Sequence, residues 1–209
     1  MVSRWRALRI SVRDVLRGRG LGVGYSVVLL LSVIVVFTQP HSAATKAVLN
    51  SSTNLHNLQT KPVFVLLLSA FVVSSPWGLW LLPVLIWVYG AAQRWLGRSA
   101  TVLVALFGHV FATVFVGALL TAGIAHHQLS RSIAREPDVG VSYGLAALGG
   151  LLVFRLPPGR RRVAIAVVTL PLLGLVAAAR TFTDLGHLVA WGIGLAIGFV
   201  GCRLAAADR

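Results

Sequence analysis

The chain has 209 residues, of which 57% are hydrophobic and 11% are charged, and its formal net charge is +14. This composition excludes a soluble globular protein and indicates an integral membrane protein with one compact helical domain. The basic residues lie between apolar segments and form no single patch, so nucleic acid is not an expected partner. The single cysteine, Cys202, excludes an internal disulfide.

Residues 1–20 form a basic N-terminal tail in which apolar residues recur at helical spacing. This tail is interpreted either as a cytoplasmic helix on an anionic lipid surface or as a disordered topogenic segment. Residues 21–204 are predicted to form the membrane domain, and residues 205–209 a cytoplasmic C-terminal tail.

Six apolar segments predict an all-α bundle with six membrane spans. Their approximate ranges are 21–38, 62–89, 99–124, 140–154, 163–179 and 184–202. Pro76 and Pro83 interrupt the second segment and free backbone carbonyls that neighbouring helices or water must satisfy. The segment 39–61 before it is polar and is interpreted as a loop.

The distribution of basic residues predicts the orientation. Six spans place both termini on one side, and most Lys and Arg residues outside the spans, including Arg160, Arg161 and Arg162, fall on that side. Both termini are therefore predicted to be cytoplasmic. The preference for Arg over Lys, with abundant Ala, Gly, Val and Leu, is typical of bacterial genomes rich in G and C. We expect a bacterial plasma membrane.

The fourth segment is too short to cross a membrane. From Gly140 to Phe154 a helix would rise only about 22 Å, against roughly 30 Å of hydrocarbon. Because basic residues hold its inner end, it must begin below the outer surface, with Ser142 about 18–20 Å above the inner boundary. A helix start at that depth must line protein or water. Ser142 is interpreted either as an N-cap or as a reactive hydroxyl in a buried, wet recess.

One histidine lies at a similar depth in the last span. His187 precedes Arg203 by sixteen residues, or roughly 24 Å of helix, which agrees with the depth of Ser142 to within about one turn. Histidine is the usual base that activates a serine nucleophile, and the pair must approach to roughly 2.6–3.2 Å. Small residues on both helix faces favour such close packing. They are Ala146, Gly149 and Gly150 on one helix and Ala190, Gly194 and Gly198 on the other.

Other polar residues have two interpretations each. His109, in the third span, is either a hydrogen-bonded structural histidine or a rival base. Asp184 either orients His187 or caps the last helix. Trp191 either stacks on His187 or packs against lipid or core. No clustered spacing of His, Cys or carboxylates indicates a metal, so we expect neither a metal nor a cofactor.

These motifs resemble the rhomboid family of intramembrane serine proteases, over spans two to six. Gly140-Val-Ser142 is similar to the family's G-x-S-G motif at the start of a short fourth span. The segment from His187 to Gly194 resembles its H-x-x-G-x-x-x-G context, with Ala190 in place of a Gly. Gly90 to Gly97 resembles the junction after span two. The resemblance implies a six-span rhomboid-like bundle in which Ser142 is the nucleophile and His187 the base.

Two departures bear on activity. Tyr143 occupies the position of the second Gly of the motif, and Trp77 and Leu81 occupy the positions of the His and Asn that help to hold the oxyanion in the family. Loss of one oxyanion donor typically costs about 10²–10³ in rate. We expect backbone N–H groups at the start of the fourth helix, near Gly140, to supply part of that stabilisation.

The leading prediction is therefore a serine-type intramembrane endopeptidase with a Ser-His dyad. The first alternative is an inactive rhomboid-fold protein that binds transmembrane helices. The second is a small transporter, which the lack of carboxylates inside the spans disfavours. The expected partners are a transmembrane substrate or client protein and membrane lipid.

Overall fold

The computed structural model describes residues 18–179 and 181–207. All regular elements in the described part are helices, which confirms the predicted all-α class. They are α2 (Gly20–Phe37), α3 (His41–Ser51), α4 (Leu55–Thr60), α5 (Pro62–Leu68), η2 (Ser69–Phe71), η3 (Pro76–Trp80), α6 (Leu81–Leu96), α7 (Arg98–Ala125), η4 (Arg131–Arg135), α8 (Val141–Leu152), η5 (Val153–Arg155), α9 (Pro158–Ala179) and α10 (Phe182–Ala207). Most of the predicted basic tail, residues 1–17, and residues 208–209 of the predicted C-terminal tail lie outside the described residues.

Four helices are long and apolar enough to cross a membrane, namely α2, α7, α9 and α10. The helices of residues 62–71 and 76–96 pass the same test together, but they are bent by 65° at the break between them. The apolar helix formed by α8 and η5 is shorter than a span. The chain is therefore a multi-pass helical membrane protein with four or five crossing elements by length and composition, and the count of six stays a prediction.

The structure corrects two details of the predicted segments. Pro83 does not interrupt the second span, because it lies in the first turn of α6, where its missing N–H would have no intrahelical partner. The break falls before Pro76, which begins η3. The polar segment 39–61 contains the helices α3 and α4, and Asn54 caps α4 by accepting a 2.9 Å hydrogen bond from the N–H of Asn57.

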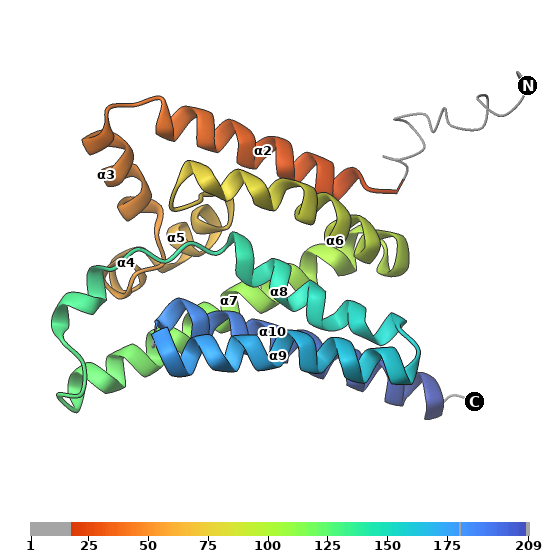
Figure 1. Cartoon of the computed structure of the whole chain (residues 1–209). Coiled ribbons are helices and arrows are strands. Elements are labelled where there is room, and N and C mark those ends of the chain that lie inside the picture. Colours follow the sequence, from red (N-terminus) through yellow and green to blue (C-terminus); the bar gives the residue numbers. More distant parts are fainter. Residues whose placement is uncertain (1–17, 180, 208–209) are drawn as a thin grey trace, which may run out of the picture.

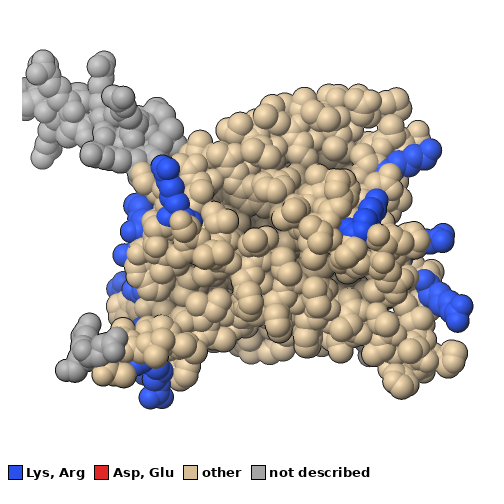
Figure 2. Space-filling model, turned by 180° about the vertical axis from the view of Figure 1, so that it is seen from behind, with Lys and Arg blue, Asp and Glu red and all other residues tan. Residues whose placement is uncertain are grey.

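The charged surface agrees with a membrane position. On the face shown in Figure 2, Lys and Arg side chains gather at two opposite ends, and a broad belt without visible charge lies between them. Large apolar side chains are exposed on the spanning helices, among them Leu103 of α7 and Val167 of α9. A surface of this kind fits the hydrocarbon layer of a bilayer.

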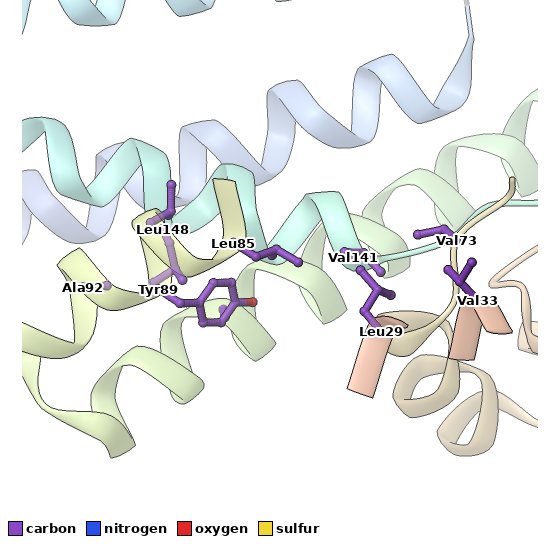
Figure 3. Packing of buried hydrophobic residues seen from close by; sticks show 10 residues of the cluster. Leu29, Val33, Val73, Leu85, Tyr89, Ala92, Val141 and Leu148 are labelled. Atoms are coloured by element: carbon purple, nitrogen blue, oxygen red, sulfur yellow. The ribbon is translucent and has the colours of Figure 1, made fainter. Parts of the chain in front are cut away.

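The short helix α8 lies inside the bundle and begins about halfway along it (Figure 1). Its neighbours are α6, α7 and α10, and the start of α2 lies at the same end of the bundle as the end of α10. One core cluster joins α2, α6 and α8, as Figure 3 shows for Leu29, Val33, Val73, Leu85, Tyr89, Ala92, Val141 and Leu148. A second cluster joins Ala112 of α7, Tyr143 of α8 and Ala190 of α10. This packing holds the start of α8 away from lipid.

Candidate functional site

The chain that enters α8 is hydrogen-bonded to other parts of the protein. The N–H of Gly140, the N-cap residue, donates to the carbonyl of Ser69 over 3.0 Å. The N–H of Asp138 donates to the hydroxyl of Ser52 over 2.7 Å, and its carbonyl accepts from the N–H of Thr53 over 2.8 Å. A helix start within a bilayer requires such partners, because lipid provides none.

Ser142 of α8 and His187 of α10 are in direct contact. The hydroxyl oxygen of Ser142 lies 2.7 Å from Nε2 of His187. Both side chains are partly buried. The hydroxyl can donate to Nε2 when the imidazole carries its hydrogen on Nδ1, and this is the arrangement that a histidine base requires. The structure thus brings together the two residues that the depth argument pairs.

Small residues let α8 and α10 approach closely at this level. Ala190 is fully buried between the helices. A Cβ on Gly194 would overlap the carbonyl of Ala147, and a Cβ on Gly150 would contact the carbonyl of Trp191. Gly198 lies against the ring of Phe154 in the same way. Ala146 packs at the edge of the cluster that contains Ala190, and Gly149 faces the indole ring of Trp191.

Tyr143 fills the space beside the dyad. It is fully buried, and its ring meets that of His187 edge to face, with centroids 5.1 Å apart and an interplanar angle of 76°. Its hydroxyl lies 3.0 Å from both carboxylate oxygens of Asp138. The phenol occupies the space that a side chain on Gly186 would need.

His109 lies on another side of the start of α8. It is 2% exposed, and its Nε2 lies 2.9 Å from the carbonyl of Leu66 and 3.3 Å from the hydroxyl of Ser69. Because a carbonyl only accepts, Nε2 carries the hydrogen and donates it. Within the described residues no hydrogen bond joins His109 to Ser142, and the Nδ1 atom of His109 is buried without a hydrogen-bond partner.

The hydrogen bonds of Asp184 and Trp191 go to residues other than His187. The carboxylate of Asp184 accepts a hydrogen bond from the hydroxyl of Thr181, whose oxygen in turn accepts from the N–H of Asp184 over 3.2 Å. This reciprocal pair caps the start of α10. The indole N–H of Trp191 donates to the hydroxyl of Thr169 on α9 over 3.0 Å.

Within the described residues, no hydrogen bond joins Trp77 or Leu81 to Ser142 or His187. Trp77 is 85% exposed on η3, and Leu81 begins α6 with an apolar side chain. In the first turn of α8 the N–H of Tyr143 donates to the carbonyl of Gly140 over 3.2 Å, so the N–H groups of Val141 and Ser142 are the ones left without an intrahelical partner.

Sequence reasoning missed the buried polar residues around the dyad. Asp138 is 4% exposed, and it contacts hydroxyl groups from Ser52, Thr53, Tyr143 and Thr183. Asp138 lies in the loop before α8, outside the spanning helices, where burial raises the pKa of its carboxyl to about 6 and the hydrogen bonds oppose that rise. The available signal was an acidic residue close to Gly140 in a chain with only five acidic residues. Among the described residues, no group of three or more His, Cys, Asp or Glu side chains could hold a metal ion.

Comparison with known proteins gives one match. A family model described as rhomboid-like protein matches residues 18–203, which is most of the chain and includes both Ser142 and His187. Searches of curated proteins and of solved structures each gave no match.

Proposed function

The chain belongs to the rhomboid-like protein family, and from this premise we propose that it is an intramembrane serine endopeptidase. Its substrates are transmembrane segments of other proteins, cut near their outer ends. The proposed topology has six spans, with α8 as the short fourth one, and both termini in the cytoplasm. In this topology the starts of α8 and α10, with Ser142 and His187, face the outer side.

The observation that carries the proposal is the 2.7 Å contact between the Ser142 hydroxyl and Nε2 of His187. A structural N-cap serine would turn its hydroxyl to the N–H groups of its own helix. Ser142 is instead the second residue of α8, and its hydroxyl meets a histidine from another helix. A nucleophile and base within hydrogen-bond distance is the arrangement that covalent catalysis requires.

The reaction follows from these two groups. The Ser142 oxygen attacks the scissile carbonyl carbon while His187 Nε2 takes the hydroxyl proton. The carbon–nitrogen bond then breaks, and His187 gives the proton to the leaving amine. Water attacks the resulting ester while His187 accepts one of its protons, and the carboxylic acid product leaves as that proton returns to the Ser142 oxygen.

The start of α8 supports the developing negative charge. A helix N-terminus carries a partial positive charge and free N–H groups, and here it adjoins Ser142. With Trp77 and Leu81 in place of side-chain donors, backbone groups do this work alone. We expect a turnover about 10²–10³ slower than that of a site with an additional donor.

A serine-reactive fluorophosphonate probe tests this proposal on the purified chain in detergent or liposomes. Wild type is expected to be labelled, Ser142→Ala and His187→Ala to lose labelling, and Ser132→Ala to keep it. Ser132 is the matched control because it is an exposed serine on η4. Labelling that persists in Ser142→Ala, or is absent from folded wild type, would refute the protease.

Trp77 and Leu81, at the positions of the family's oxyanion-holding His and Asn, favour a second candidate, an inactive rhomboid-fold protein that binds transmembrane helices. This function needs the bundle but not the reactivity of the dyad. Photocrosslinking of client helices in membranes distinguishes the two. An inactive binder captures the same clients with wild type and with Ser142→Ala and releases no cleaved product.

A further inference from the structure

Asp138 is a buried carboxyl group that the proposed reaction does not use. It is 4% exposed, and burying a carboxylate is unfavourable unless hydrogen bonds replace its water. Here the hydroxyl of Tyr143 lies 3.0 Å from both carboxylate oxygens, and the hydroxyls of Thr53 and Thr183 each lie 3.4 Å from one of them. The closest of these partners is Tyr143.

The backbone of Asp138 is fixed independently of Tyr143. Its N–H donates to the Ser52 hydroxyl over 2.7 Å, and its carbonyl accepts from the N–H of Thr53 over 2.8 Å and from the Thr53 hydroxyl over 3.1 Å. The carboxylate is therefore a stationary acceptor. Because a carboxylate only accepts, the phenol must donate to it, and this sets the direction of the Tyr143 side chain.

Tyr143 touches α10 at two successive residues. Its hydroxyl end fills the space beside Gly186, and its ring meets the imidazole of His187 edge to face at 5.1 Å. An edge-to-face contact depends on the relative direction of the two rings. Rotation of the phenol away from Asp138 would therefore remove the contact that faces the His187 ring on this side.

We propose that Asp138 is a positioning residue that acts through Tyr143 to hold the His187 imidazole toward Ser142. The path runs from the carboxylate of Asp138 through Tyr143 to the dyad, and the hydrogen bonds of the Asp138 backbone to the Ser52 hydroxyl and the Thr53 N–H hold its start in place. This role rests on the proposed function, because the orientation of the His187 ring matters for the reaction of Ser142. The orientation itself can be measured without turnover. For histidines that bind a metal, loss of a partner that orients the ring typically lowers affinity or activity about 10–100-fold, and we expect an effect of this order here.

Three variants test the path. Tyr143→Phe keeps an aromatic ring at this position and removes the hydrogen bond that fixes it to Asp138, and Asp138→Asn removes the charge at nearly constant size. Thr53→Val is the matched control, because it removes a hydroxyl partner of Asp138 and leaves Tyr143 unchanged. Each protein is labelled with ¹⁵N-histidine, and the His187 signals are assigned by their loss in His187→Ala. Fluorophosphonate labelling rates are measured on the same samples.

We expect Tyr143→Phe to shift the His187 nitrogen signals and to slow Ser142 labelling about tenfold. Asp138→Asn should change both measurements in the same direction. It should add nothing in the Tyr143→Phe background, because residues that act through one contact are not additive. Thr53→Val should lower the unfolding temperature and leave the His187 signals in place.

Three results would overturn the positioning role. The first is a Tyr143→Phe protein whose His187 signals are those of wild type. The second is an Asp138→Asn effect that is the same with and without the Tyr143 hydroxyl. The third is a shift of the His187 signals in Thr53→Val as large as that in Tyr143→Phe. If wild type shows no Ser142-dependent labelling, the protease proposal fails by itself. The nitrogen signals then decide the positioning role alone.

Discussion

Gly140 lies directly against the imidazole of His109, so that a Cβ on Gly140 would overlap the ring. The ring cannot move aside freely, because its Nε2 donates to the carbonyl of Leu66 over 2.9 Å. Gly140 is the N-cap of α8 and precedes Ser142 by two residues. The place where α8 begins therefore depends on a histidine that has no hydrogen bond to Ser142 in the described part of the chain.

Gly140→Ala is expected to destabilise the fold and to displace Ser142, because the methyl group must push either the His109 ring or the start of α8. Overpacking of this kind typically costs about 1–3 kcal/mol. Thermal unfolding in detergent and fluorophosphonate labelling measure the two effects. Gly159→Ala is the control, since a Cβ at Gly159 meets nothing within 4 Å. Similar behaviour of the two variants would contradict the expectation.

His109 and His187 are expected to respond differently to substitution. His109→Gln can still donate to the Leu66 carbonyl, so it should lose about 1–2 kcal/mol of stability and retain Ser142 labelling. His187→Ala should abolish labelling with a smaller effect on unfolding. Loss of labelling in a folded His109→Gln protein would instead identify His109 as part of the reactive site.

The packing of α8 on α10 can be tested with two glycines on the same helix. Gly194→Ala would place a Cβ into the carbonyl of Ala147 and is expected to cost about 1–3 kcal/mol. Gly192→Ala meets nothing within 4 Å and should be neutral or slightly stabilising, because alanine favours a helix. Denaturant unfolding in mixed micelles compares them. Equal unfolding free energies of the two variants would contradict the close packing of α8 against α10 at Gly194.

The stability of the fold should depend on the ionisation of Asp138. Burial raises the pKa of this carboxyl from 3.8 to about 6, so the folded state binds the proton more tightly than the unfolded state. The resulting stabilisation of the fold is complete below the pKa of Asp138 in the unfolded state. It is lost as the pH rises through the pKa in the folded state, and the total loss is about 3 kcal/mol.

The measurement is the difference in unfolding free energy between wild type and Asp138→Asn from about pH 4 to pH 7. The histidines are common to both proteins, so their titration largely cancels in the difference. Wild type is expected to lose stability relative to Asp138→Asn as the pH rises. Parallel pH profiles would contradict the raised pKa.

Much of the site follows from distances along the chain. The length of an apolar helix and the thickness of hydrocarbon are both known, so the short segment before Arg155 has to begin inside the membrane. The same arithmetic puts Ser142 and His187 at one level, and glycines in both helices permit a close approach. These inferences need only local composition and helical rise, which explains why they are available before any tertiary contact is known.

The residues that surround the dyad could not be predicted in this way, because they are brought there by contacts between residues far apart in sequence. Asp138 meets Thr53 and Thr183, and His109 meets Leu66 and Gly140, only once several helices have packed. Hydropathy does not distinguish a polar residue in a loop at the surface from one that is buried beneath other helices. The sequence by itself therefore determined the all-helical membrane class and predicted a common depth for the pair, and only the tertiary structure decided what surrounds that pair.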